Sequence, residues 1–207
     1  MGYRIEYRYS AGDVIHQAHS VMMANKEGDG PILGGSTDGE VISRVLQAKD
    51  GIYTVSLESR TLSGEGLLKQ NAGLHSQAVF TMDPSGAMLS CSNPQVPLIN
   101  QGFPREEMEV GHTWKTMDLS NPAQPMSTTY KLHSIENTPS GTVALIASEG
   151  FAENESERSQ TLIQSTQRFH LSLGHQLEST TVIKTVYKDG RTSDMVVESK
   201  LTERSSS

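Results

Sequence analysis

Cysteine and aromatic side chains are scarce in this sequence. Cys91 is the only cysteine among 207 residues, which excludes an intramolecular disulfide and a metal site made of several cysteines of one chain. Trp114 is the only tryptophan, beside four Phe and six Tyr, so a core built from this chain contains few large rings. Nine Met compensate in part, because methionine fills irregular apolar space without fixing one shape.

Long apolar runs and clustered positive charge are also absent. No window approaches the roughly 18 apolar residues of a membrane-spanning helix, so the sequence predicts a soluble domain with no transmembrane segment. The net charge is −7, and basic residues alternate with acidic ones, as at Arg4, Glu6 and Arg8. Because nucleic-acid binding needs clustered Lys and Arg, we expect no nucleic-acid partner for this acidic chain. The first six residues contain no apolar signal core, and we expect an export signal to be missing from this chain.

The signatures of common catalytic, cofactor and metal sites are missing too. There is no H-E-x-x-H, EF-hand loop, Walker A motif or complete dinucleotide-binding fingerprint. Ser36 is followed two residues later by Asp38, where a nucleophile elbow needs glycine. His16 and His19 stand three residues apart, which places them on opposite faces of a strand. The sequence predicts no catalytic residue, no cofactor and no metal ligand, and it leaves a hydrolase with a convergent site as the least favoured function.

The dominant pattern is a period of two, which is typical of β-strands. Residues 3–9 alternate aromatic or aliphatic side chains with charged ones. Glycine-containing turns, such as Asp50–Gly51 and Lys188–Arg191, separate such segments. The glycine-rich segment 27–35 is predicted to be a loop. The expected strands are 3–9, 14–23, 40–47, 52–57, 76–82, 87–91, 112–117, 128–135, 142–148, 162–173, 176–187 and 192–202. We therefore predict one all-β domain, 1–207, whose antiparallel meander forms a barrel, a half-barrel or a strongly curved sheet.

The two halves of the chain share the order of their turns. Gly12 and Gly111 each precede an expected strand, and the hairpins at Asp50–Gly51 and Ser140–Gly141 follow at similar distances. This order predicts two pseudo-repeats that share one sheet, and chance recurrence of β-turns is the alternative. The pseudo-repeats span 3–92 and 111–203, and residues 93–110 connect them.

Three short motifs resemble those of a known group of proteins. They are Tyr7-x-Tyr9-x-x-Gly12-Asp13, Asp83-x-x-Gly86 and Val110-Gly111-x-x-Trp114. The pattern spans most of the chain and resembles uncharacterised bacterial β-rich proteins, many of them exported or lipid-anchored. Their layout is similar to the LolA-like lipoprotein carriers, in which a curved antiparallel sheet covers an apolar cavity. The resemblance implies an extracytoplasmic, cell-envelope location, although this chain lacks the long helices of those carriers.

Two functions of different classes follow from this sequence. The first is a non-catalytic binding module of the cell envelope for an apolar small molecule or lipid, with Trp114, Phe169 and Met82 lining the ligand cavity. The alternative is a structural domain with a filled core that works by binding a protein partner. Under either function we expect Trp114 to be buried in the main apolar cluster, because it is the largest apolar side chain of the sequence.

Overall fold

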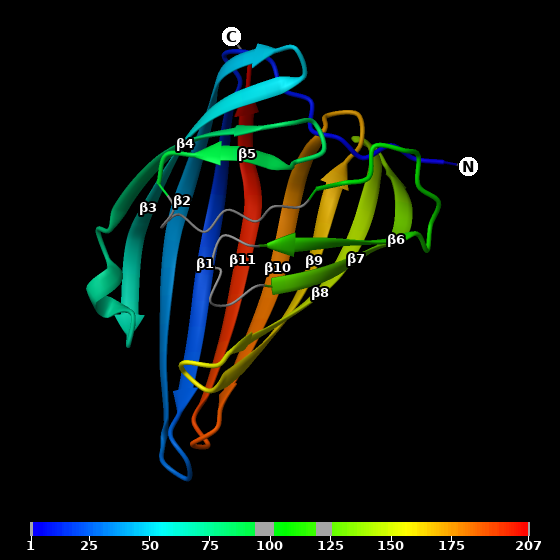
Figure 1. Ribbon diagram of the computed structural model, residues 1–207. Coiled ribbons are helices and arrows are strands. Elements are labelled where there is room, and N and C mark those ends of the chain that lie inside the picture. The colour runs from blue at the N-terminus through cyan, green and yellow to red at the C-terminus, as the bar shows by residue number, and fades with distance from the viewer. Residues whose placement is uncertain (1, 94–101, 119–125, 207) are drawn as a thin grey trace.

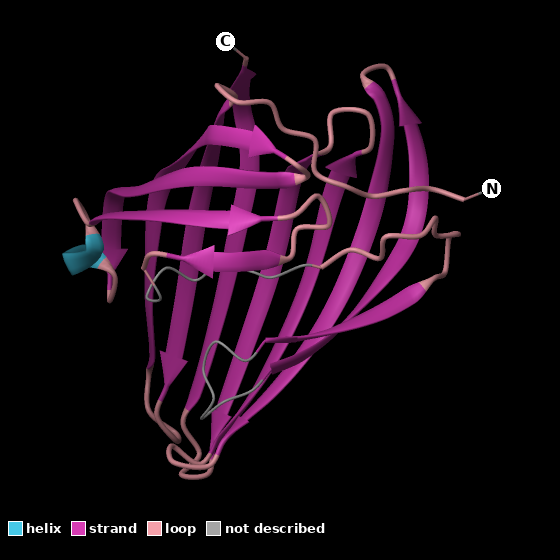
Figure 2. Ribbon diagram, turned by 45° about the horizontal axis from the view of Figure 1, so that its top comes forward, coloured by secondary structure: helices cyan, strands magenta, loops and turns pink. Residues whose placement is uncertain are grey.

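The computed structural model describes residues 2–93, 102–118 and 126–206, and these fold almost entirely into β-strands. Eleven strands form one antiparallel sheet, which curves strongly around its own concave face (Figure 1). The strands converge towards the end that holds the β1–β2 and β10–β11 loops, here called the narrow end (Figure 2). The prediction of an all-β, strongly curved antiparallel sheet is confirmed.

The strands are longer than their sequence patterns indicate. Their bounds are β1 Val14–Lys26, β2 Ile32–Lys49, β3 Ile52–Gly66, β4 His75–Met82, β5 Met88–Cys91, β6 Thr113–Asp118, β7 Met126–Thr138, β8 Gly141–Asn154, β9 Ser159–His170, β10 His175–Tyr187 and β11 Thr192–Ser205. The single helical element among the described residues is the short 3-10 turn η1, Lys69–Asn71. Part of the predicted connection 93–110 lies outside the described residues.

The strands form one continuous sheet, and its two edge strands are not the first and last strands of the chain. Its strand order is β5-β4-β3-β2-β1-β11-β10-β9-β8-β7-β6, so every sequential pair forms a hairpin except β5 and β6. The first and last strands, β1 and β11, pair in the middle of the sheet. β5 and β6 are the two edges, and β4 and β5 cross in front of β1 and β2 in Figure 1. The curvature therefore brings both ends of the sheet over its concave face.

The predicted first strand, 3–9, is the clearest error of the sequence interpretation. These residues pair with the rest of the chain by a single β-bridge, between Tyr3 and Met108. Residues 3–10, here called the strap, instead run extended across the wide end of the sheet (Figure 1). Backbone hydrogen bonds hold it there, from Tyr7 N to Pro84 O at 2.7 Å and from Arg8 N to Gly174 O at 3.1 Å. The period of two was correct, because an extended segment alternates its side chains whether or not it lies in a sheet.

The glycine-rich segment 27–35 was also predicted incorrectly. Only residues 27–31 form a loop, and Gly34 and Gly35 lie within β2. A Cβ built on Gly35 would lie 2.7 Å from Glu65 O and 2.8 Å from Leu67 N. Glycine is therefore needed here because the chain entering η1 packs directly on the backbone of β2, not because the segment turns.

Two apolar clusters fill the concave face at the wide end. The larger, here called the plug, contains Ile5, Phe103, Met108, Trp114, Tyr130, Leu132, Ala144, Ile146 and Phe169, with Tyr7, Ile135 and Leu171 packed against it. The smaller contains Ile15, Val45 and Val55, with Tyr9, Ala48, Tyr53, Phe80 and Leu201 packed against it. The strap contributes to both clusters, so its apolar side chains cover the wide end from above.

The two halves of the chain enter the sheet through matching contacts. Gly12 N donates to Val45 O at 2.8 Å, and Val45 N donates to Asp13 O at 2.9 Å. In the second half Gly111 N donates to Leu132 O at 2.8 Å, and Leu132 N donates to His112 O at 3.0 Å. Gly12 and Gly111 also share a positive φ, 93° and 95°.

Two irregularities of the sheet in the first half recur in the same order in the second half, whereas those after His16 and Asp38 have no counterpart. One residue bulges after Val45 in β2 and one after Leu132 in β7. A second bulge opens the β4–β5 hairpin after Met82 pairs with Met88, and another opens β9–β10 after Phe169 pairs with Gln176. Bulges are specific features of a sheet, and their shared positions are hard to attribute to recurring turns. We therefore propose that 3–92 and 111–203 are pseudo-repeats, in which β1–β5 correspond to β6–β10.

Candidate functional site

A hollow crosses the middle of the sheet, and most of its lining residues alternate with those that face the apolar clusters, so it opens on the convex face. Its volume is about 610 Å³, which lies within the range of small-molecule sites. Seven neighbouring strands of the sheet contribute to it, in the order β3, β2, β1, β11, β10, β9 and β8. At the same level, a line of small or polar residues crosses the concave face, here called the polar row: Gln167, Ser179, Ser199, His19 and Gly39.

The register of the sheet brings the polar row together. Ser179 pairs with Gln167 on one side and Ser199 on the other, and His19 pairs with Ser199 and Gly39. Directly paired residues point to the same face, so these five positions cross the concave face side by side. The strand neighbours of these residues point to the convex face, and they line the hollow there.

Charged residues next to the polar row interact on the convex face. Arg168 Nη1 donates to Glu178 Oε1 at 3.2 Å, and its Nη2 donates to Glu136 Oε2 at 3.1 Å. Asp38 Oδ2 accepts a hydrogen bond from Ser63 Oγ at 3.1 Å. Arg168, Glu178 and Asp38 are among the residues that line the hollow, so its surface is charged.

His19 is the titratable residue of the polar row. Its ring lies over Gly39, where an added Cβ would come within 2.5 Å of His19 Cε1 and Nε2. Burial lowers the pKa of His19, and the nearby Asp38 carboxylate opposes this effect only in part. The imidazole is therefore neutral at pH 7. Its buried Nδ1 has no hydrogen-bond partner among the described residues.

A second line of paired residues lies on the same face, four positions nearer the narrow end. This apolar row consists of Ile163, Ile183, Met195, Met23 and Gly35. At about 3.3 Å per residue, it lies roughly 13 Å from the polar row. Its four apolar side chains are half-buried, and none belongs to the plug or to the smaller cluster. Between the two rows lie Ser165, Thr181, Val197, Val21 and Thr37.

Two of the three predicted lining residues lie together in the plug. Trp114 is 9% exposed and stacks on Tyr130 with ring centroids 5.3 Å apart, so the prediction that it is buried in the main cluster is confirmed. Phe169 is fully buried and meets Phe103 edge-on at 5.4 Å. Met82 is buried in β4 outside both clusters. None of the three is among the residues that line the hollow, and their contact with a ligand stays a prediction.

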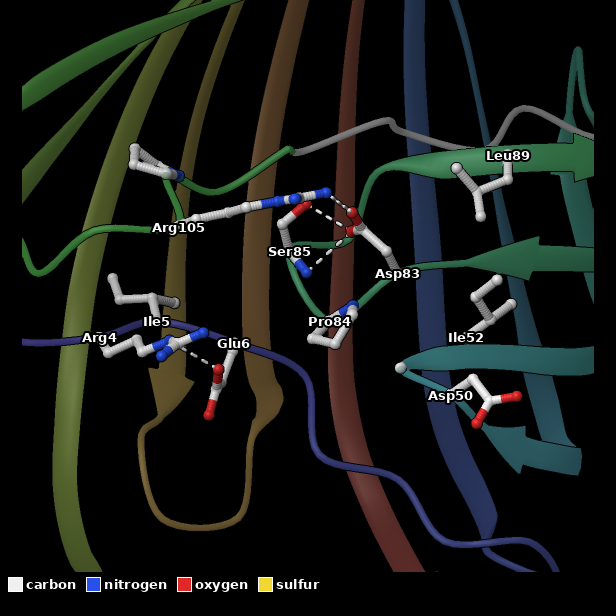
Figure 3. A pocket seen from close by; sticks show the side chains of 12 residues that line it. Arg4, Ile5, Glu6, Asp50, Ile52, Asp83, Pro84, Ser85, Leu89 and Arg105 are labelled. Atoms are coloured by element: carbon white, nitrogen blue, oxygen red, sulfur yellow. Dashed lines mark hydrogen bonds and ion pairs between the residues drawn. The ribbon is translucent and has the colours of Figure 1, made fainter.

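A smaller pocket of about 410 Å³ lies beside the strap (Figure 3). Its charged side chains are largely engaged with one another. Arg4 Nε lies 2.8 Å from Glu6 Oε2, and Arg105 Nη2 lies 3.1 Å from Asp83 Oδ2. Asp83 also accepts from the backbone N of Ser85 at 2.9 Å, which shapes the β4–β5 turn. These interactions hold the β4–β5 turn and the strap in place, so the pocket offers few free charged groups to a ligand.

A buried polar network fixes the strap to the middle of the sheet. Arg204 of β11 donates from Nη2 to Asp13 Oδ2 at 2.8 Å and to Arg8 O at 2.8 Å, and from Nη1 to Leu173 O at 2.6 Å. Asp13 is 1% exposed. Burial alone would raise the Asp13 pKa, but hydrogen bonds from Ser10 N, Ser206 and Arg204 lower it below its ordinary value.

His175 belongs to the same network. Its Nδ1 lies 3.0 Å from Tyr9 Oη, and its buried Nε2 has no partner among the described residues. Burial lowers the pKa of His175 to about 4, Arg204 lowers it further, and Asp13 acts in the opposite direction. The folded protein therefore holds this imidazole neutral.

The neutral His175 should make the fold sensitive to mild acid. The unfolded chain binds a proton at this residue near pH 6.5 and the folded chain only near pH 4, so stability falls as the pH drops through this window. We expect a loss of about 3 kcal/mol in unfolding free energy between pH 7 and pH 4 from this residue. Urea denaturation at both pH values measures it. His175→Gln should remove most of the difference, and an equally steep loss in that variant would contradict the assignment.

Known proteins give similarity in fold only. No family model matches the chain, and no curated protein matches it in sequence. Three solved structures are similar. A protein of Bacteroides fragilis with a YmcC-like fold, assigned as exported, has 14% identity, covers 98% of this chain and 99% of its own, and gives a TM-score of 0.40. A LolA superfamily protein of Nitrosomonas europaea has 10% identity, coverages of 95% and 89%, and a TM-score of 0.29. An outer membrane channel of Pseudomonas putida has 9% identity, coverages of 94% and 97%, and a TM-score of 0.32.

The first two structures are of the kinds that the sequence resembles, an exported protein and a LolA superfamily protein. Within the described part of the chain, no helix is long and apolar enough to cross a membrane. The described residues also contain no group of three or more side chains placed to hold a metal ion.

Proposed function

We propose that this protein is a non-catalytic binding module of the cell envelope and that it holds an apolar or lipid-like ligand on its concave face. The apolar row carries this proposal. Its side chains from β1, β9, β10 and β11 lie on the concave face, are half-buried and form no part of a core. Covering such side chains with an apolar ligand is favourable by about 25 cal/mol for each Å² removed from water. The resemblance to exported and lipid-anchored proteins supports the envelope location.

The alternative function, a filled-core domain that binds a protein, is favoured by a separate observation. The wide end of the concave face is filled by the plug and the smaller cluster. A core that filled the whole concave face would leave no room for a ligand at the apolar row. The two functions therefore differ in whether this row takes up an apolar probe.

Adjacent methionines on β1 provide a matched test. Met23 belongs to the apolar row, whereas Met22 lies on the convex face and is 49% exposed. Met23→Gln keeps the side-chain length but places an amide against the ligand, and we expect it to weaken binding of the uncharged probe N-phenyl-1-naphthylamine about tenfold. Probe fluorescence on titration measures the affinity.

Met22→Gln is the control, and we expect it to bind the probe as the unmodified protein does. Equal affinities of the two variants would mean that the probe does not contact the apolar row. If the unmodified protein takes up no probe at all, the filled-core alternative replaces the proposed function.

A further inference from the structure

Two buried histidines are paired in the β9–β10 hairpin, and they differ in how their ring nitrogens are bonded. His170 and His175 lie directly opposite each other and are 2% and 4% exposed. His170 Nε2 lies 2.7 Å from Ser140 O, and its Nδ1 accepts from Leu173 N at 3.2 Å. His175 Nδ1 lies 3.0 Å from Tyr9 Oη, but its Nε2 is buried without a partner among the described residues. His175 is therefore the incompletely bonded group of this hairpin.

The strap is attached to the sheet beside this histidine. Tyr9 belongs to the strap, so its contact with His175 joins the strap to β10. The preceding strap residue, Arg8, donates from its backbone N to Gly174 O at 3.1 Å, and its carbonyl accepts from Arg204 Nη2 at 2.8 Å. Three contacts of two successive strap residues therefore converge on the groups around His175.

A proton on His175 meets a cation and no free carboxylate. The groups that face its imidazole are the Tyr9 hydroxyl of the strap, the Arg204 guanidinium of β11, the Asp13 carboxylate and His170 of β9. The Asp13 carboxylate is already engaged, because it accepts from Arg204 Nη2 at 2.8 Å. Burial lowers the pKa of His175 to about 4, and Arg204 adds to this effect. The charged imidazole therefore favours water, and Tyr9, with its ring centroid at 5.9 Å, has to move away before water reaches it.

We propose that protonation of His175 releases the strap from the wide end while the sheet stays folded, so that acid uncovers the apolar side chains beneath the strap. This release is independent of the proposed function. The strap is suited to separate movement because it pairs with the rest of the chain by a single β-bridge and is joined to β1 through Gly12, which has a φ of 93°. Its departure withdraws Ile5 and Tyr7 from the plug and Tyr9 from the smaller cluster.

Hydrogen exchange of two strap amides measures the release. The backbone N–H groups of Tyr7 and Arg8 donate to Pro84 O and Gly174 O, so they are protected only while the strap is attached. The released strap leaves His175 near its ordinary pKa of 6.5 instead of about 4, and we expect the two protection factors to fall about fiftyfold from pH 7 to pH 4.5. Nuclear magnetic resonance resolves the two amides singly, with rates corrected for intrinsic exchange. Amides of the paired strands β1 and β11 should stay better protected than the strap at both pH values.

His175→Gln removes the titrating group, and strap protection in this variant should change less than about threefold between the same pH values. His170→Gln is the matched control, because it removes the other buried histidine of the hairpin, and it should keep the fiftyfold dependence. His75→Gln is a second control at a histidine whose side chain is 45% exposed, where the fold should be undisturbed.

Equal protection of the strap and of the sheet at pH 4.5 would overturn the proposal, because the strap would then leave only when the whole fold unfolds. A fall of the same size in His175→Gln would also overturn it, since another group would then be the trigger. Loss of the pH dependence in His175→Gln alone, with the strap less protected than the sheet, supports it.

Discussion

Trp114→Ala is expected to lower the free energy of unfolding by about 3–5 kcal/mol. The indole stacks on Tyr130 at 5.3 Å and meets Phe103 edge-on at 6.1 Å, so its removal leaves a cavity between β6, β7 and the segment that follows Gly102. Single domains have total stabilities of roughly 5–15 kcal/mol, so this loss is a large fraction of the whole. Urea denaturation followed by circular dichroism measures it without relying on the tryptophan.

Trp114→Phe is the control, and it should cost much less because most of the buried ring area remains. Since Trp114 is the only tryptophan, its fluorescence reports on the plug alone. The emission should be blue-shifted and protected from iodide, because the ring is 9% exposed. A small loss in Trp114→Ala, or emission that iodide quenches readily, would contradict a core role and favour a wall of an open cavity.

The strands and hairpins could be predicted from the sequence because their signals are local. The Asp50–Gly51 turn is an example, since both residues adopt positive φ, 52° and 73°, as a two-residue hairpin requires. The pairing of β1 with β11 has no comparable signal. It joins residues almost two hundred positions apart, such as Val14 and Ser205, and nothing in either segment specifies the partner.

The strap shows where local patterns stop being informative. Alternation in residues 3–9 indicated which side chains face the core, and Ile5 is indeed 1% exposed. It did not indicate that the backbone leaves the sheet, because that depends on Pro84 O and Gly174 O from two distant turns. The loop prediction at Gly35 failed for a similar reason, because the glycine is needed for close packing against the backbone near η1, which is distant in sequence.

The candidate site was missed for a reason of composition. Sequence analysis favoured large apolar residues as the ligand contacts and therefore selected Trp114 and Phe169, which the fold uses in the plug. The polar row consists of common residues such as Ser179 and Ser199, and only the register across five strands makes them neighbours. Period-two alternation shows which residues of one strand share a face. Which residues of different strands become neighbours on that face depends on the strand order, which comes from tertiary pairing.

Arg204→Met is expected to destabilise the protein by about 3–5 kcal/mol, because it leaves a buried carboxylate without its cation. The guanidinium is the group that joins the strap to β11. It contacts the Asp13 carboxylate and the carbonyls of Arg8 and Leu173, and it lies 5.6 Å from the centre of the Tyr9 ring. Methionine keeps much of the apolar stem but supplies no donor to these three oxygens. Chemical denaturation at pH 7 measures the loss.

Arg191, in the β10–β11 turn, provides a matched control. It also forms an ion pair with an aspartate, 2.8 Å from Asp189 Oδ2, and also lies over a tyrosine, 4.7 Å from the Tyr187 ring centre. Its side chain is 50% exposed, whereas that of Arg204 is 18% exposed. Exposed ion pairs contribute about 0–1 kcal/mol, so Arg191→Met should cost little.

Adding Asp13→Asn to Arg204→Met should recover part of the loss, because the unpaired charge is then removed. Similar small losses in both arginine variants would mean that the strap is held by its apolar side chains and backbone hydrogen bonds, and not by the buried ion pair.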